Sequence, residues 1–205
     1  MKRKTTIGIY ILLLTLTARA QEDKPKQQSS NIISLAPICI GGEGVGIGVA
    51  YERILDRGGY FSFVLPVSSP FIGYVNYTGT FGREFQTWAY SGERQRILQL
   101  SPGLKFYPVG NKGRARYALA ALYNYQAGYR ESYHYYYGGK YRVDINKMAI
   151  MLQNSVNIFP TPHLYIGTEL GFGYTFLNEE GVNGLIHRIN TDEVVQLAFR
   201  IGYRF

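Results

Sequence analysis

Cysteine is almost absent from this chain of 205 residues, which contains only Cys39. A single cysteine cannot form an internal disulfide, so we interpret it as a small apolar side chain that fills space. The three histidines, His134, His163 and His187, are far apart in the sequence, and no metal-ligand spacing joins them to one another or to Cys39. The sequence therefore predicts neither a disulfide framework nor a metal ion or other cofactor.

Long apolar runs are also missing, apart from one near the start at residues 7–16. Basic residues 2–4 precede this run, and residues 18–20 (Ala-Arg-Ala) follow it as a small-x-small cleavage site. This order predicts a secretory signal peptide over residues 1–20. An uncleaved anchor is the alternative, but a spanning helix needs about 20 apolar residues. No cysteine follows the cleavage site, which argues against a lipoprotein, and the polar residues 21–30 are expected to form a flexible periplasmic linker.

A strong excess of basic residues disappears once the leader is removed. The formal net charge of +8 falls to +4 because Lys2, Arg3, Lys4 and Arg19 leave with the signal peptide. The remaining basic residues are scattered singly and form no basic arm. We therefore expect no nucleic acid among the partners of this protein.

What the chain does contain is alternation between large apolar residues and small or polar ones, and it is clearest at the end. Large apolar side chains occupy every second position there: Val195, Leu197, Phe199, Ile201, Tyr203 and Phe205. The positions between them hold small or polar residues. Because successive residues of a strand point to opposite faces, this segment is predicted to be a strand with one apolar and one polar face.

Eight segments of this kind are expected after the linker. They cover residues 31–40, 45–55, 60–67, 97–108, 115–130, 146–158, 164–176 and 194–205. The links after the second, fourth and sixth are short, whereas those at 68–96, 131–145 and 177–193 are long; the link after the first, at 41–44, is the one short link on the long side. Outer-membrane barrels have short periplasmic turns and longer outer loops. The sequence thus predicts an all-β fold, an eight-stranded antiparallel up-and-down transmembrane β-barrel over residues 31–205, with a monomer as the default state.

The composition of the two strand faces indicates whether the barrel lies in a membrane or in water. A water-soluble cup of the lipocalin type has the same strand number but an apolar interior. Here one face is large and apolar, and the other is rich in glycine and alanine with a few long polar residues. We expect those residues to form a salt-bridged polar cluster inside a narrow barrel; they are Glu52, Lys105, Arg116, Gln153, Glu169 and Arg200.

Aromatic residues near the strand ends are expected to form the girdles at the two membrane interfaces. These are Tyr203 and Phe205, Phe106 and Tyr107, Tyr117 and Tyr165. Asn154 is a misfit, because the alternation places it on the lipid face. A β-bulge in its strand would remove it from that face.

The end of the chain resembles the C-terminal signal by which bacterial outer-membrane barrels are recognised for assembly. The residues that carry this resemblance are Phe199, Ile201, Tyr203 and Phe205. The signal often has a glycine five residues before the terminal aromatic, and here that position is Arg200, with the glycine at 202. With its leader, eight amphipathic strands and turn parity, the chain is similar to the barrels of outer membrane proteins A and X and to the barrel-only proteins of Bacteroidetes.

This resemblance implies a location in the outer membrane of a Gram-negative bacterium. The implied partners are outer-membrane lipid and lipopolysaccharide, the barrel-assembly machinery during biogenesis, and an extracellular glycan or protein at the loops. No peptidoglycan-binding domain is expected after Phe205, and no plug is expected before the barrel. The expected function is a non-enzymatic one, structural or in surface interaction.

Two alternatives stay open, a small low-conductance pore and a lipid-A-modifying enzyme. A barrel enzyme of that kind would need His and Ser side chains within hydrogen-bond reach on the outer rim. His134 and His187 are expected in outer loops and His163 in a periplasmic turn, each as a solvated residue.

A tyrosine-rich segment is the most unusual feature of the expected loops. Its tyrosines are Tyr133, Tyr135, Tyr136, Tyr137 and Tyr141. They predict either a surface that binds glycan, lipopolysaccharide or protein, or two long strands that continue as a hairpin around Gly138-Gly139 with tyrosines paired across it. The hairpin is the favoured interpretation. The loop around residues 74–94, which contains Trp88, is expected to be either adhesive or a cover.

Overall fold

The computed structural model describes residues 31–41, 44–72, 74–78, 84–88, 95–110, 112–134, 139–182, 185–188 and 193–205. The expected signal peptide and linker, residues 1–20 and 21–30, lie outside the described residues. Among the described residues, no helix is long and apolar enough to cross a membrane. The described chain is built from β-strands and turns.

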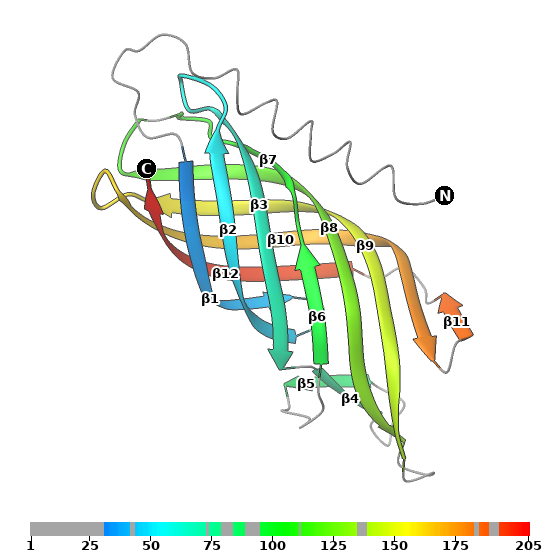
Figure 1. Ribbon diagram of the computed structural model, residues 1–205. Coiled ribbons are helices and arrows are strands. Elements are labelled where there is room, and N and C mark those ends of the chain that lie inside the picture. Colours follow the sequence, from blue (N-terminus) through cyan, green and yellow to red (C-terminus); the bar gives the residue numbers. More distant parts are fainter. Residues whose placement is uncertain are drawn as a thin grey trace.

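The strands of the barrel wall pair antiparallel with their neighbours in chain order, while β4 and β5 form a separate two-stranded sheet and β11 pairs with β10 (Figure 1). Their bounds are β1 Asn31–Gly41, β2 Gly44–Ile54, β3 Phe61–Ile72, β4 Tyr74–Thr78, β5 Glu84–Trp88, β6 Gln95–Leu100, β7 Gly103–Phe106, β8 Ala115–His134, β9 Gly139–Ile158, β10 Leu164–Val182, β11 Leu185–Arg188 and β12 Glu193–Arg204. β6 and β7 form one strand of the wall that is interrupted at Ser101 and Pro102, because both pair with β3 and with β8.

The sheet closes on itself because β12 pairs with β1, so the predicted fold, an eight-stranded antiparallel barrel, is confirmed. The last hydrogen bonds of the closing seam join Asn31 and Phe205, with N···O distances of 3.0 and 2.9 Å. The register of β1 shifts at Pro37 against both neighbours. Proline has no N–H to donate, so a bulge is the ordinary way to accommodate it in a strand.

The turns that follow β2, β7 and β9 lie at one end of the barrel, here called the turn end, together with Asn31 and Phe205 (Figure 1). Gly59 and Gly110 have φ angles of +69° and +59° in these turns, a conformation that favours glycine. The short link expected between the second and third strands, at residues 56–59, is therefore a turn in the structure. Asp56 closes it: its carboxylate accepts hydrogen bonds from the N–H groups of Phe61 (2.7 Å) and Tyr60 (3.2 Å).

The opposite end, here called the loop end, is uneven and is more ordered than the sequence predicts. β8, β9 and β10 have 20, 20 and 19 residues against 11 in β1 and β2, and they rise beyond the rest of the wall (Figure 1). The expected long links at 131–145 and 177–193 are thus wrong in part, because strands continue into them. The link at 68–96 likewise contains the end of β3, the hairpin of β4 and β5, and the start of β6.

The outer face of the barrel is apolar all the way round. Large exposed hydrophobic side chains occupy most of the outward positions of the wall strands, with Asn154 and Thr168 among the polar exceptions, and Ile150 and Leu152 of β9 reach 61% and 65% exposure. On β12 the alternating apolar positions from Val195 to Phe205 all point outward, as the sequence predicts. Exposure of this apolar band to water would be unfavourable, whereas the acyl chains of a membrane would cover it.

Two expectations about single residues are wrong. Asn154 needs no bulge: the β8–β9 register is unbroken around it, and it stays on the outer face, where the Tyr117 hydroxyl donates a hydrogen bond to its amide oxygen. Tyr107 and Tyr165 do not belong to the girdles. They are 4% and 1% exposed and point into the barrel, because they occupy the inward positions beside Phe106 and Leu164.

Candidate functional site

A chain of ion pairs fills the lumen on the turn-end side of its middle. Lys105 Nζ lies 3.1 Å from Glu52 Oε2 and 3.4 Å from Glu169 Oε1, and Arg200 Nε lies 2.6 Å from Glu169 Oε2. The four residues come from β2, β7, β10 and β12, and each is at most 4% exposed. Two carboxylates and two cations therefore neutralise one another in a space without access to bulk water.

Neutral side chains complete the hydrogen bonding of the two carboxylates. The Tyr107 and Ser62 hydroxyls both donate to Glu52 Oε1, each at 2.7 Å. Gln153, from β9, hydrogen-bonds to Glu169. Such additional donors are what make a buried ion pair tolerable, because each lone pair left without a partner is costly.

Below the ion pairs, the lumen is plugged at the turn end. Phe159, Tyr165 and Ile32 form a buried apolar cluster. The Arg116 guanidinium lies 4.4 Å from the centroid of the Phe159 ring, and that of Arg204 lies 5.5 Å from it. Arg116, which the sequence assigns to the polar cluster, is thus buried but sits on this plug, where its Nε also donates to the carbonyl oxygen of Gly113 at 3.2 Å.

Above the ion pairs, apolar and neutral polar side chains share the lumen. The buried apolar ones are Val64, Ala120, Leu122, Ala149, Met151 and Val194, and Asn124 donates a hydrogen bond to the sulfur of Met151 at 3.2 Å. Near the loop end a further cluster joins Ile97, Val143 and Ile145, with Val182 packed against it. Side chains therefore fill the interior at several levels along the described barrel, as expected for eight strands.

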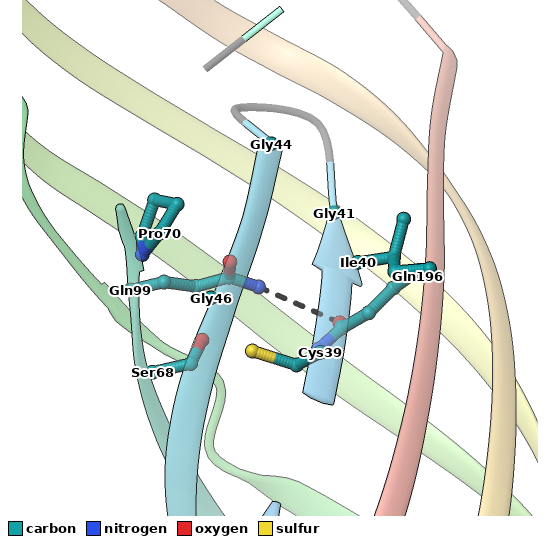
Figure 2. A pocket seen from close by; sticks show the side chains of 9 residues that line it. All are labelled: Cys39, Ile40, Gly41, Gly44, Gly46, Ser68, Pro70, Gln99 and Gln196. Carbon is teal, nitrogen blue, oxygen red and sulfur yellow. Dashed lines mark hydrogen bonds between the residues drawn. The ribbon is translucent and has the colours of Figure 1, made fainter. Parts of the chain in front are cut away.

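A small cavity remains beside the turn that joins β1 and β2 (Figure 2). Its volume is about 10 Å³, roughly the room that one water molecule needs. Figure 2 shows the Cys39 thiol directed toward the Ser68 hydroxyl, and Gln99 Nε2 donates across the lumen to Gln196 Oε1 at 3.5 Å. Cys39 is buried and free, in keeping with its interpretation as a small filling residue.

The extended strands at the loop end carry a second set of charges, which is only partly buried. Arg130 donates to both oxygens of Glu180, at 2.9 and 3.1 Å, and Lys147 lies 4.0 Å from the same carboxylate. On the outside, Arg188 pairs with Glu179 at 3.2 Å. These described charges of the extended strands are therefore paired within the protein.

The other sequence-predicted residues lie in three places. The residues of the proposed assembly signal lie on the outer face of the closing strand, where Tyr203 stacks against Phe205 and His163. Tyr133 and Tyr141 lie in β8 and β9, and the two strands stay paired as far as His134 opposite Gly139, as the favoured hairpin predicts. In the register Tyr133 is opposite Lys140 and Tyr141 is opposite Ser132, so neither has a tyrosine as its register partner. Tyr135, Tyr136 and Tyr137 lie outside the described residues.

The three histidines are not gathered into one site. The ring of His163 contacts the carbonyl oxygen of Arg204 through Nδ1 at 3.1 Å. His134 ends β8, and His187 is exposed on β11. Within the described part of the chain, no group of three His, Cys, Asp or Glu residues is placed to hold a metal ion.

Comparison with solved structures places this architecture. The chain is similar to a major outer membrane protein from Thermus thermophilus, with a TM-score of 0.59 and 16% identity over 85% of this chain and 98% of that one. It is also similar to OprG from Pseudomonas aeruginosa, with a TM-score of 0.57 and 12% identity over 87% and 97%. The chain has the fold of a small outer-membrane β-barrel. Neisserial surface protein A matches as well, with a TM-score of 0.51 and 10% identity over 86% and 97%.

At these identities the likeness extends to the fold alone. No protein-family model matches the sequence, and no curated protein sequence matches it. The roles of the residues that fill the lumen therefore have to be inferred from the geometry of this barrel and not from the similar structures.

Proposed function

We propose that the protein is an integral barrel of the outer membrane of a Gram-negative bacterium, reached after cleavage of the leader. The observation that carries the proposal is the predominantly apolar outer face around a lumen closed by buried ion pairs. A chain that exposed such a band to water would aggregate, whereas lipid and lipopolysaccharide would cover it. The barrel-assembly machinery would recognise the terminal strand through Phe199, Ile201, Tyr203 and Phe205.

Within that location we propose a structural or surface-interaction role. The barrel supports the extended strands β8, β9 and β10, and the tyrosine-rich segment is the one that joins β8 to β9. An extracellular glycan or protein is the proposed partner of this hairpin. No catalytic step is part of the proposal, since His163 is engaged with the backbone of Arg204.

The closed lumen argues against a conducting pore. Lys105 and Arg200 occupy the cross-section together with both carboxylates, and the cavity above them has room for about one water.

Recording the current across planar bilayers tests this point. The purified full chain is inserted, and a general porin of the same preparation serves as the positive control. We expect no steady conductance from this protein. Regular open-channel steps from the wild-type barrel would contradict the proposal and favour the pore.

A further inference from the structure

The two turns that carry charge at the turn end form a single surface. The turn between β2 and β3 packs on the turn between β7 and β8: Tyr107 N donates to Tyr60 O at 2.7 Å, and the backbone of Gly110 lies against that of Gly58. A Cβ atom at Gly110 would lie only 2.4 Å from Gly58 O, so the close approach requires glycine there. Side chains from both turns therefore share one surface.

This surface is basic. Residues 53–60 and 107–114 contain four cations, Arg53, Arg57, Lys112 and Arg114, and a single acid, Asp56. The acid is engaged by the backbone N–H groups of Tyr60 and Phe61. Across the described residues, no ion pair involves any of the four cations. These four residues are called the basic collar below.

The exposed cations of the loop end are paired to a larger extent. Of those that the structure describes there, Arg142 lies 2.7 Å from Asp144 and Arg188 lies 3.2 Å from Glu179, while Arg96 has no acid within ion-pair distance. All four cations of the basic collar are without such an acid among the described residues, so their charge is available to an anion from outside the protein.

Exposed apolar side chains stand among the collar residues. Leu55, Tyr60 and Val109 are 56%, 41% and 48% exposed, and they continue the apolar band of the barrel into the turns. Apolar side chains beside arginine and lysine at the end of an apolar band are the composition of a surface that lies at lipid headgroups.

We propose that the basic collar binds the phosphate headgroups of anionic phospholipids in the leaflet that surrounds the turn end. The inference rests on the proposed membrane location. The guanidinium and ammonium groups supply the charge-assisted hydrogen bonds, and the apolar residues keep the turns at headgroup depth. The collar would thus fix how deep the barrel sits and which lipids surround it.

Lipid selection by the reconstituted protein tests the proposal. The full chain is placed in nanodiscs, or purified in mixed micelles, from an equimolar mixture of phosphatidylglycerol and phosphatidylcholine, and the lipids that remain bound are quantified. The decisive variant combines R57Q, K112Q and R114Q. The matched control removes three exposed cations at the loop end, with R96Q, R142Q and R188Q.

We expect the wild type and the loop-end variant to enrich phosphatidylglycerol several-fold over the starting mixture. The collar variant should lose most of that enrichment, since each cation near an anionic surface contributes about fivefold to binding. Salt at about 1 M, where the Debye length is about 3 Å, should reduce the wild-type enrichment in the same way without any substitution.

Three outcomes would overturn the proposal: equal enrichment in the collar variant, loss in the loop-end variant only, or displacement of phosphatidylglycerol by inorganic phosphate. The last result would show a site for the free ion. A gel shift on boiling, measured for each variant, reports the barrel separately. A variant that shifts on boiling but keeps its enrichment argues against lipid binding by the collar, whereas a wild type without a shift argues against the membrane location. If the collar variant does not fold, the effect of salt on the wild type still tests the proposal.

Discussion

The charged residues of the lumen compensate one another's buried charges. Glu169 is the link between the two cations, because one of its oxygens faces Lys105 and the other faces Arg200. All three are almost fully buried, so bulk water cannot replace a missing partner. The cost of losing one member is therefore the cost of leaving buried charges uncompensated.

The substitution Glu169→Gln should lower the free energy of unfolding by about 3–5 kcal/mol, since it leaves the cations without their shared carboxylate. Glu179→Gln is the matched control, because it breaks a pair whose Arg188 partner is mostly exposed and should cost less than about 1 kcal/mol. Urea unfolding of the refolded barrel in detergent measures both. Equal effects would show that burial does not determine the strength of these pairs.

Asp56 makes one turn sensitive to pH. Slight burial raises the pKa of its carboxyl, but the hydrogen bonds from Phe61 and Tyr60 outweigh that effect, so the pKa lies below the usual value. A carboxyl with a lowered pKa in the folded state stabilises the fold above its unfolded pKa, and this contribution is lost as pH falls through the folded pKa.

We therefore expect the free energy of unfolding of the wild type to decrease as the pH falls below about 4. The Asp56→Asn variant should lose less of its unfolding free energy over the same pH range. The difference should be modest, about 1 kcal/mol or less, because water reaches this turn. Unfolding curves at neutral and acid pH check it. If the two proteins lose the same stability in acid, the turn is not held by this carboxylate.

At the scale of elements, alternation along a strand predicts most of what lines the lumen. It assigns Glu52, Lys105, Gln153, Glu169 and Arg200 to the inside, and they lie there. The same rule places Tyr107 and Tyr165 inside, yet their position near strand ends suggested the girdles. Which inward residues touch follows from the stagger between strands, and no pattern within one strand contains that information.

The extension of β8, β9 and β10 was underestimated for a different reason. Beyond the membrane both faces meet water or other loops, so the apolar alternation that marks a strand fades. The backbone pairing nevertheless continues, from Glu131 opposite Arg142 to His134 opposite Gly139. Apolar alternation in the sequence therefore predicts where the membrane-spanning part of a strand ends, but not where the strand itself ends.

The extension should be dispensable for folding. Arg130 faces Val143 in the register, so a two-residue Asn-Gly turn can join them in place of residues 131–142. We expect the shortened chain to keep its heat-modifiable band and a free energy of unfolding within about 1 kcal/mol of the wild type. Loss of the folded band would mean that the hairpin helps to form the barrel.

The polar pair on the lipid face belongs to β8 and β9. The Tyr117 hydroxyl and the Asn154 amide oxygen satisfy each other where lipid offers no partner. Tyr117→Phe alone should destabilise the barrel by about 1 kcal/mol, and adding Asn154→Leu should restore the loss, since both partners are then apolar. A double-mutant unfolding series in lipid vesicles checks this, and simple additivity of the two effects would argue against the pair.

At the scale of the whole molecule, one property joins the separate features: the barrel faces lipid on its outside and is filled with side chains on its inside. The apolar band, the closing seam between β1 and β12, and the basic collar at the turn end all take their meaning from a membrane around the wall. The fold is shared with solved outer-membrane proteins at 10–16% identity, so the location has to be tested on this chain itself.

The most direct test is the gel mobility of the protein in outer-membrane fractions, with and without boiling, for the full chain and for a version lacking Phe205. We expect a folded band in the outer membrane that shifts on boiling and is much weaker without Phe205, because the closing seam and the proposed assembly signal both end at that residue. A soluble periplasmic protein with no shift would show that the barrel does not lie in a membrane.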